Sequence, residues 1–369
     1  MLGPEVTFTD RDYLIIDGRK LLYLAGTDYH RLSGHPKTIS AVTRAAKKFG
    51  IGSTGSRTTT GNHSLLLQLE EKAAIFFETE ASVVLSSGYL SNSVLLQGIS
   101  DRFNIIFIDE KAHPSLYDAA TQACYMTNKK LVKFRYMDPQ SLEDILKKYL
   151  SKGSRPLILT DGVFPVNGDI PPLNEYAQVI NNYAGKILLD DAHAMAVVGK
   201  TGKGSWEAKK IDRDLVYQTG TLSKGFGAFG GIITGERDLA AEIYDKSLAF
   251  VGSTGLALPL AAAGLSSVSH LLANRVSITQ LQARAISLKK RFRKIGFEMP
   301  ETTAPIFSIT YDNSSKNIRL KELLIENGIY PPFMEYPGSP AGGHFRFIIT
   351  SSTTEDQINM LYETIKSSL

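Results

Sequence analysis

The stretch LVYQTGTLSKGFGAFGGIITG (215–235) sets Lys224 in a glycine-rich turn between two short apolar runs. Runs of this kind, rich in β-branched residues, indicate strands buried on both faces of a sheet. Similar runs alternate with helix-like patterns along the preceding part of the chain, which predicts an α/β fold with a mostly parallel sheet between helices. The other strand-like runs are VVL (83–85), IIFID (105–109), LILTD (157–161) and KILLDDA (186–192), and the helical patterns include residues 63–77, 140–150 and 174–184.

The pattern changes after about residue 255, where a long and broken helical stretch begins. It is followed by strand-like PIFSITY (305–311) and HFRFIIT (344–350), with a helix at 319–328 between them and another from about 354. This part predicts a smaller α+β domain. The first 45 residues are interpreted as an arm and the start of a helix. We therefore expect an N-terminal arm (1–45), a large domain (46–270) and a small C-terminal domain (271–369).

Composition excludes several classes of protein. The 41 basic and 37 acidic side chains give a net charge of +4 and are spread along the chain, which argues against dedicated nucleic-acid binding. No apolar run reaches the roughly 18 residues of a membrane span. Cys124 is the only cysteine, and no signal pattern opens the sequence, so a cytoplasmic location is expected. Cys124 itself is more typical of a small buried hydrophobe than of a nucleophile.

Ligands of open parallel sheets collect at the carboxyl ends of the strands, and unusual residues follow four of the predicted strands. Lys224 lies among small residues that let the backbone approach a bulky ligand, and a lysine kept from water can form a Schiff base. A surface lysine on a turn is the alternative. Asp190, directly after a buried strand, calls for a cationic partner such as a protonated pyridine nitrogen. His193, three residues later, could then meet a phenolic oxygen of the same ring.

Two further strand ends complete this set. Ser87, Gly88 and Tyr89 lie at a predicted strand-to-helix junction, where backbone amides and the helix dipole attract a phosphate. His113, in IDEKAHPSLYD (108–118), could stack on a flat ring. Each has a structural alternative, such as a glycine turn or a core histidine. A metal site made by Asp190, Asp191 and His193 is a weaker interpretation, because no further cluster has ligand spacing, and no metal is expected. The order of all four sites along the chain favours one cofactor site.

This order of motifs resembles the α-oxoamine synthases among the fold-type-I pyridoxal-phosphate (PLP) enzymes. The resemblance extends from about residue 25 to the end of the chain. It implies the fold-type-I transferase fold, a mostly parallel seven-stranded sheet between helices with a smaller C-terminal α+β domain. The matching segments are GSRTTTG (55–61), QLEEKAA (68–74), SSGYLSN (86–92), DEKAHPSLYD (109–118), TDGVFPVNGDIPPL (160–173), DDAHAMAVVGKTGKGSWE (190–207) and GTLSKGFGAFGG (220–231).

The resemblance also implies roles for individual residues. Lys224 carries PLP as a Schiff base, His113 stacks on the ring, Asp190 pairs with the pyridine nitrogen, and His193 meets the phenolic oxygen. Arg346 is expected to bind the substrate carboxylate. The alternative is that it is only a surface arginine on a strand. Arg57 is a second candidate for substrate binding. The residues expected to hold phosphate are Ser87, Gly88, Tyr89, Thr221 and Ser223, with Ser253 and Thr254 contributed by the other subunit of a homodimer that shares its active site.

The implied reaction is a decarboxylative condensation of an amino acid with an acyl-CoA or another acyl thioester, as in 8-amino-7-oxononanoate synthase or glycine C-acetyltransferase. The chain is thus expected to be a PLP-dependent acyltransferase. Another fold-type-I activity, such as that of an aminotransferase, would use the same Lys224 and Asp190. A non-catalytic subunit would not need Lys224, and a nucleotide-binding regulator has no supporting motif. The departures from the family pattern lie around the substrates: His344, Leu66, Pro165, Ala194 and Ala196.

Overall fold

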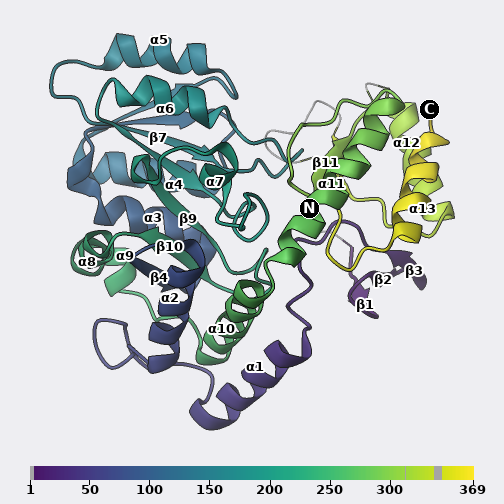
Figure 1. The fold of residues 1–369 in the computed structure, drawn as a ribbon, viewed down its shortest axis with the longest axis horizontal. Coiled ribbons are helices and arrows are strands. Elements are labelled where there is room, and N and C mark those ends of the chain that lie inside the picture. Colours follow the sequence, from purple (N-terminus) through teal and green to yellow (C-terminus); the bar gives the residue numbers. More distant parts are fainter. Residues whose placement is uncertain (1–3, 312, 336–342) are drawn as a thin grey trace.

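The computed structural model describes residues 4–311, 313–335 and 343–369. Figure 1 shows a large part built around one sheet and a smaller part that contains both ends of the described chain. The strands are β1 (Thr7–Phe8), β2 (Tyr13–Ile16), β3 (Arg19–Leu22), β4 (Ala81–Leu85), β5 (Ile105–Asp109), β6 (Lys130–Phe134), β7 (Pro156–Asp161), β8 (Lys186–Asp190), β9 (Val216–Thr221), β10 (Gly231–Gly235), β11 (Ile306–Ile309), β12 (Phe333–Met334) and β13 (His344–Ile348). The α-helices are α1 (Pro36–Phe49), α2 (Ser64–Phe77), α3 (Gly88–Gly98), α4 (Pro114–Thr127), α5 (Pro139–Tyr149), α6 (Leu173–Asn181), α7 (Ser205–Lys209), α8 (Arg237–Lys246), α9 (Leu248–Val251), α10 (Leu258–Ala273), α11 (Val276–Lys294), α12 (Ser314–Glu326) and α13 (Glu355–Lys366).

The central sheet has seven strands in the order β4-β10-β9-β8-β7-β5-β6. The pairs from β9 to β6 are parallel, and β10 runs antiparallel to both of its neighbours. This confirms the predicted mostly parallel sheet. Inner strands such as β5 and β7 are almost entirely apolar because helices cover both faces of the sheet. Ile105 and Phe107 belong to a core with α5 and α6, whereas Ile106 and Ile108 belong to a core with α3, α4 and α8.

Local sequence signals fix where several helices begin. The Asp138 side chain accepts the Ser141 amide at the start of α5, and Pro139 occupies the first turn, where its missing N–H costs nothing. Thr354 and Gln357 form a capping box at the start of α13. These caps explain why the helices predicted near 140 and 354 start there.

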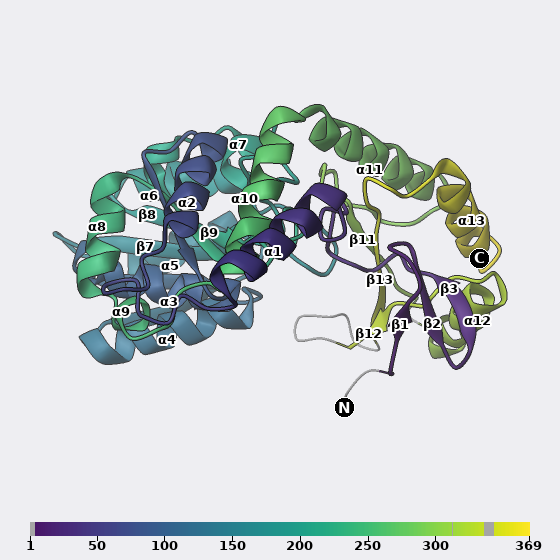
Figure 2. The ribbon, with the colours of Figure 1, turned by 90° about the horizontal axis from the view of Figure 1, so that it is seen from below.

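The smaller part confirms the predicted α+β character after residue 270. Its sheet has the order β11-β13-β12, and α11, α12 and α13 contribute to one apolar core with it. The N-terminal strands β1, β2 and β3 form a separate antiparallel sheet beside it, as Figure 2 shows. Leu22 bridges to Ile329, and the Ile348 amide donates to the Leu24 carbonyl. The arm predicted for the first 45 residues thus contains three strands, and the proposed division at 45 and 270 stays a prediction.

One edge of the central sheet collects the carboxyl ends of β4, β5, β7, β8 and β9. Asp161 of β7 is in register with Asp190 of β8. Gly231 of β10 is paired with both Leu85 of β4 and Thr221 of β9, so these two strand ends also lie at this edge. Among the described residues, no helix is both long and apolar enough to cross a bilayer.

Candidate active site

A cavity of about 230 Å³ lies at this edge of the sheet. A larger groove of about 810 Å³ lies between α1 and α10, but no carboxylate or histidine lines it. The chemistry predicted from the sequence therefore belongs to the smaller cavity. Its lining is Ser87, Gly88, Tyr89, His113, Ser115, Asp161, Asp190, Ala192, His193, Thr221, Ser223, Lys224 and Phe229.

Lys224 lies in the turn between β9 and β10. The turn is closed by hydrogen bonds from the Gly227 amide to the Lys224 carbonyl (3.0 Å) and from the Ala228 amide to the Leu222 carbonyl (2.9 Å). Burial lowers the pKa of the Lys224 amine to about 8, although Asp190 and Asp161 oppose this shift. A useful fraction of the amine is consequently neutral near pH 7, which is the form that attacks a carbonyl carbon.

Asp190 is held rigidly at the end of β8. One carboxylate oxygen accepts the Ala192 amide at 3.0 Å, and the other accepts the Asn92 side-chain amide at 2.7 Å. Thr219 in turn donates to the Asn92 carbonyl oxygen at 2.6 Å, which fixes the orientation of that amide. The carboxylate is thus set toward the cavity by groups whose own positions are fixed. Asn92 was not among the residues predicted from the sequence.

Asp161 is a second buried acid in the cavity, and the sequence analysis did not single it out. Its carboxylate accepts the His113 amide at 2.7 Å. Burial and the neighbouring charge of Asp190 raise the pKa of Asp161 well above its ordinary value. The two carboxyl groups differ in environment, as paired acids in active sites often do. The available signal was that LILTD (157–161) ends in an acid just as KILLD (186–190) does.

Both predicted histidines line the cavity. His113 caps α4, with its Nδ1 bonded to the Ser115 hydroxyl at 2.8 Å. His193 Nδ1 is 2.8 Å from the Tyr29 hydroxyl, a contact not foreseen from the sequence. Burial lowers the pKa of each histidine, and the charge of Lys224 lowers it further. Both rings are therefore neutral at pH 7.

The predicted phosphate-binding residues form one wall of the cavity. A Cβ atom at Gly88 would come within 2.7 Å of Thr221 Cβ, so only glycine lets α3 approach β9 this closely. The Thr221 hydroxyl bonds the Ser223 hydroxyl at 3.0 Å. The Tyr89 amide already donates to the Ser87 side chain at 3.2 Å, and the Tyr89 phenol bonds Asp118. Two hydroxyls and the N-terminus of α3 thus converge on one corner.

Arg346 comes from β13 in the smaller part of the molecule. It donates one hydrogen bond to the Pro165 carbonyl at 3.4 Å, whereas its buried Nε has no partner among the described residues. Its charge lowers the pKa values of Lys224 and His193, so it lies within electrostatic reach of the cavity. A half-buried guanidinium whose buried Nε has no partner among the described residues suits an anionic ligand.

Arg57, Ser253 and Thr254 are not part of the cavity lining. The Arg57 guanidinium donates to both carboxylate oxygens of Glu70, at 2.9 and 2.8 Å, and to the Asn62 side chain at 3.0 Å. Ser253 donates to a backbone carbonyl within its own turn. The predicted ligand contacts of these three residues stay predictions.

Asp191 faces away from the cavity. Its carboxylate accepts the Ser205 hydroxyl (2.6 Å) and amide (3.1 Å) and the Gln218 side-chain amide (2.6 Å). Burial raises the pKa of Asp191 to about 7. Within the described part of the chain, no three acids, histidines or cysteines gather as a metal site would require.

The sequence is similar to a known protein family and to named relatives. The family described as aminotransferase class I and II matches residues 19–365. The 8-amino-7-oxononanoate synthase of Thermoanaerobacter pseudethanolicus is 30% identical over 94% of this chain and 87% of its own. The 8-amino-7-oxononanoate synthase 1 of Bacillus velezensis is 31% identical, over 95% of this chain and 89% of its own.

Solved structures agree with this assignment. Serine palmitoyltransferase of Sphingomonas wittichii superposes with a TM-score of 0.89, 25% identity and coverage of 98% of this chain and 91% of that one. The 8-amino-7-oxononanoate synthase of Francisella tularensis gives a TM-score of 0.78, 25% identity and coverage of 94% and 97%. The chain therefore belongs to the aminotransferase class I and II family and, within it, to the α-oxoamine synthases, which are PLP-dependent acyltransferases.

Proposed function

We propose that the protein condenses a small amino acid with an acyl thioester, releasing the thiol and CO2 to leave an α-amino ketone. The observation that carries the proposal is the single cavity in which a lysine amine with a pKa of about 8 lies with Asp190, His113 and His193. The names of the curated relatives support the reaction type, because 8-amino-7-oxononanoate has an amino carbon next to a ketone.

The cavity residues fit PLP. Lys224 would hold the aldehyde carbon covalently, and Asp190, fixed by Asn92, would pair with the ring nitrogen. Thr221, Ser223 and the start of α3 would hold the phosphate. When bound, the cofactor supplies an electron sink for charge that develops at the amino acid's α-carbon.

Lys224 also suits the proton transfers of such a reaction. Its neutral amine would be able to take a proton from the α-carbon of a bound amino acid and return it. Burial and the charge of Asp190 raise the pKa of Asp161, which weakens its ion pairing with Lys224. Asp190 supplies the opposing charge at the other end of the site.

Arg346 would bind the carboxylate of the amino acid. Among the described residues its Nε has no hydrogen-bond partner, so it would be available for a bidentate pair with the carboxylate. Replacing it by glutamine should raise KM for the amino acid roughly 10- to 100-fold, the loss of a charged hydrogen bond. An unchanged KM would assign Arg346 to structure alone.

We also propose a cytoplasmic homodimer in which Ser253 and Thr254 reach the partner's phosphate site. Their turn precedes α10 and lies outside the cavity of their own chain, which supports a contact in trans. Light scattering should give a dimer. A Lys224→Ala chain and a Thr254→Ala chain, each weakened alone, should regain part of the activity when mixed, and failure to do so would argue against sharing.

The cofactor and reaction are tested together. With PLP bound, the purified protein should absorb at about 420 nm. Borohydride should remove that band and leave the cofactor attached to Lys224. Gly, Ala, Ser and Thr are then paired with short and long acyl-CoA while thiol release is followed. No thiol from any pair, with amino transfer to a keto acid instead, would establish the aminotransferase alternative.

A further inference from the structure

Tyr29 does not line the cavity but contacts His193, which does. The residue lies 164 positions before His193 in the sequence, and its hydroxyl is 2.8 Å from His193 Nδ1. Tyr29 is fully buried, and the two rings meet edge to face with centroids 6.3 Å apart. This contact is therefore shielded from water, where the placement of a single proton matters most.

The groups around this contact determine whether the Tyr29 hydroxyl or His193 Nδ1 is the hydrogen-bond donor. Within residues 4–311, 313–335 and 343–369, no second acceptor lies within hydrogen-bonding distance of the Tyr29 hydroxyl. If His193 carried its proton on Nδ1, the phenolic proton would be buried without an acceptor, which is costly. Burial also raises the pKa of Tyr29, so the phenol stays protonated, while the His193 ring stays neutral. The hydroxyl is therefore the donor, and Nδ1 is the acceptor.

We propose that Tyr29 is a positioning residue that keeps the proton of His193 on Nε2, so that His193 donates a hydrogen bond into the cavity. A neutral imidazole has one donor and one acceptor nitrogen, so fixing one side fixes the other. The ligand atom that faces His193 must then be an acceptor. This inference rests on the proposed function, in which that atom is the phenolate oxygen of PLP.

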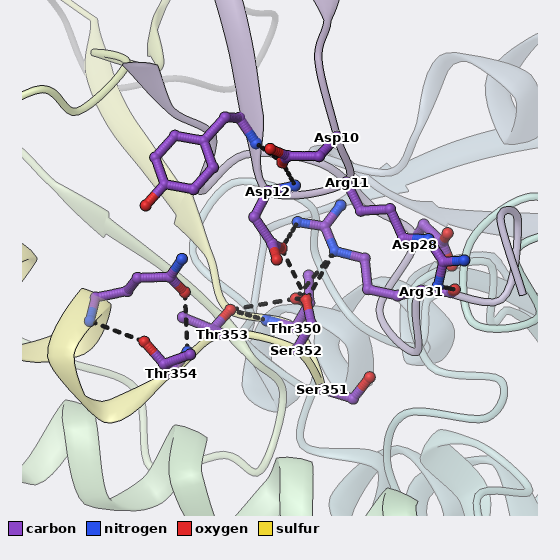
Figure 3. A network of polar contacts seen from close by, with 12 residues as sticks. Asp10, Arg11, Asp12, Asp28, Arg31, Thr350, Ser351, Ser352, Thr353 and Thr354 are labelled. Carbon is purple, nitrogen blue, oxygen red and sulfur yellow. Dashed lines mark hydrogen bonds and ion pairs between the residues drawn. The ribbon is translucent and has the colours of Figure 1, made fainter. Parts of the chain in front are cut away.

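Tyr29 and the two residues that follow it are held in place by hydrogen bonds to distant parts of the chain. The Ser351 amide donates to the Tyr29 carbonyl at 2.8 Å, and His30 Nε2 lies 2.7 Å from the Ala196 carbonyl. Arg31 extends the anchoring into the smaller part of the molecule, as Figure 3 shows. Its guanidinium bonds Asp12 at 3.0 Å, Thr350 at 3.2 Å and Ser352 at 3.3 Å.

The decisive measurement is the tautomer of His193 in cofactor-free protein. Protein labelled with 15N-histidine would be studied by long-range 1H–15N NMR, with the His193 signals identified by their loss in His193→Gln. Wild type should carry the proton on Nε2, and Tyr29→Phe should show a mixture of both tautomers. A proton on Nδ1 in wild type would overturn the proposal, whether or not Tyr29→Phe folds.

Cofactor binding gives an independent readout. Tyr29→Phe should weaken PLP binding roughly three- to tenfold, the loss of one well-oriented neutral hydrogen bond. The same change in a His193→Gln background should have no further effect, because the influence of Tyr29 passes through His193. An unchanged Kd in Tyr29→Phe, or an equal loss in both backgrounds, would refute the inference.

Tyr176→Phe is the matched control. The Tyr176 hydroxyl is also buried, but it has no partner among the described residues and lies in the core beneath α6. Its removal should leave the His193 tautomer and the PLP affinity unchanged. If wild type bound no PLP at all, the proposed function would fail, whereas the tautomer measurement would still decide the role of Tyr29.

Discussion

Replacing Arg57 by methionine should lower the free energy of unfolding by about 3 to 5 kcal/mol, because it leaves the Glu70 carboxylate buried without its counter-charge. The side chains of Arg57 and Glu70 are only 5% and 8% exposed. Glu70 also accepts the Val84 amide at 2.9 Å, so it cannot turn toward solvent without breaking its hydrogen bond to β4. The loss should therefore fall at the upper part of this range.

Urea unfolding followed by circular dichroism measures this loss, and a double variant provides the control. Arg57→Met with Glu70→Met removes both charges and should recover part of the stability, because the desolvation cost disappears with the pair while the buried Val84 amide loses its acceptor. A loss below about 1 kcal/mol in the single variant, or a double variant less stable than the single one, would refute the reasoning.

The same variants test the predicted contact between Arg57 and substrate. If Arg57 acts only through Glu70, activity should recover with stability in the double variant. If Arg57 contacts the substrate, KM stays raised in both variants, because neither restores the guanidinium.

Three other predictions concern titration and packing. The rate at which PLP combines with cofactor-free protein should rise about tenfold per pH unit below about 8 and level off above it, because burial sets the Lys224 pKa there; a flat stopped-flow profile would contradict this. Gly88→Ala should weaken PLP binding at least about tenfold, measured by fluorescence titration, because the new Cβ would meet Thr221 Cβ at 2.7 Å. Burial lowers the pKa of Lys289 from 10.5 to about 7, so the unfolded chain binds more protons between these values and stability should rise with pH across them. Lys289→Met should flatten that rise in urea-unfolding measurements, and an unchanged slope would show that another group causes it.

The central sheet could be predicted because its strands are buried on both faces. Apolar runs such as IIFID (105–109) and KILLD (186–190) need no alternation and stand out from the helices between them. β6 was missed because KLVKF (130–134) is an edge strand with exposed lysines. β1, β2 and β3 were missed because they are short and do not form a continuous buried run. They are stabilised by pairing with one another and with distant residues.

The cavity was predictable to the extent that its residues follow strands. Lys224, Asp190 and His113 lie at strand ends or within four residues of them, where topology alone brings them together. Tyr29 and Asn92 could not be found in this way. Their roles depend on contacts across 164 and 98 positions, which no local pattern encodes.

The pairing of Leu22 with Ile329 has a consequence during synthesis. Residues 7–22 leave the ribosome well before Ile329, which bridges to Leu22 and follows about 300 residues later. At roughly 5 to 20 residues per second, that interval lasts about 15 to 60 s. Until then Leu22 and Leu24 lack these backbone partners, so residues 7–22 cannot reach their final place before residue 329 has been made.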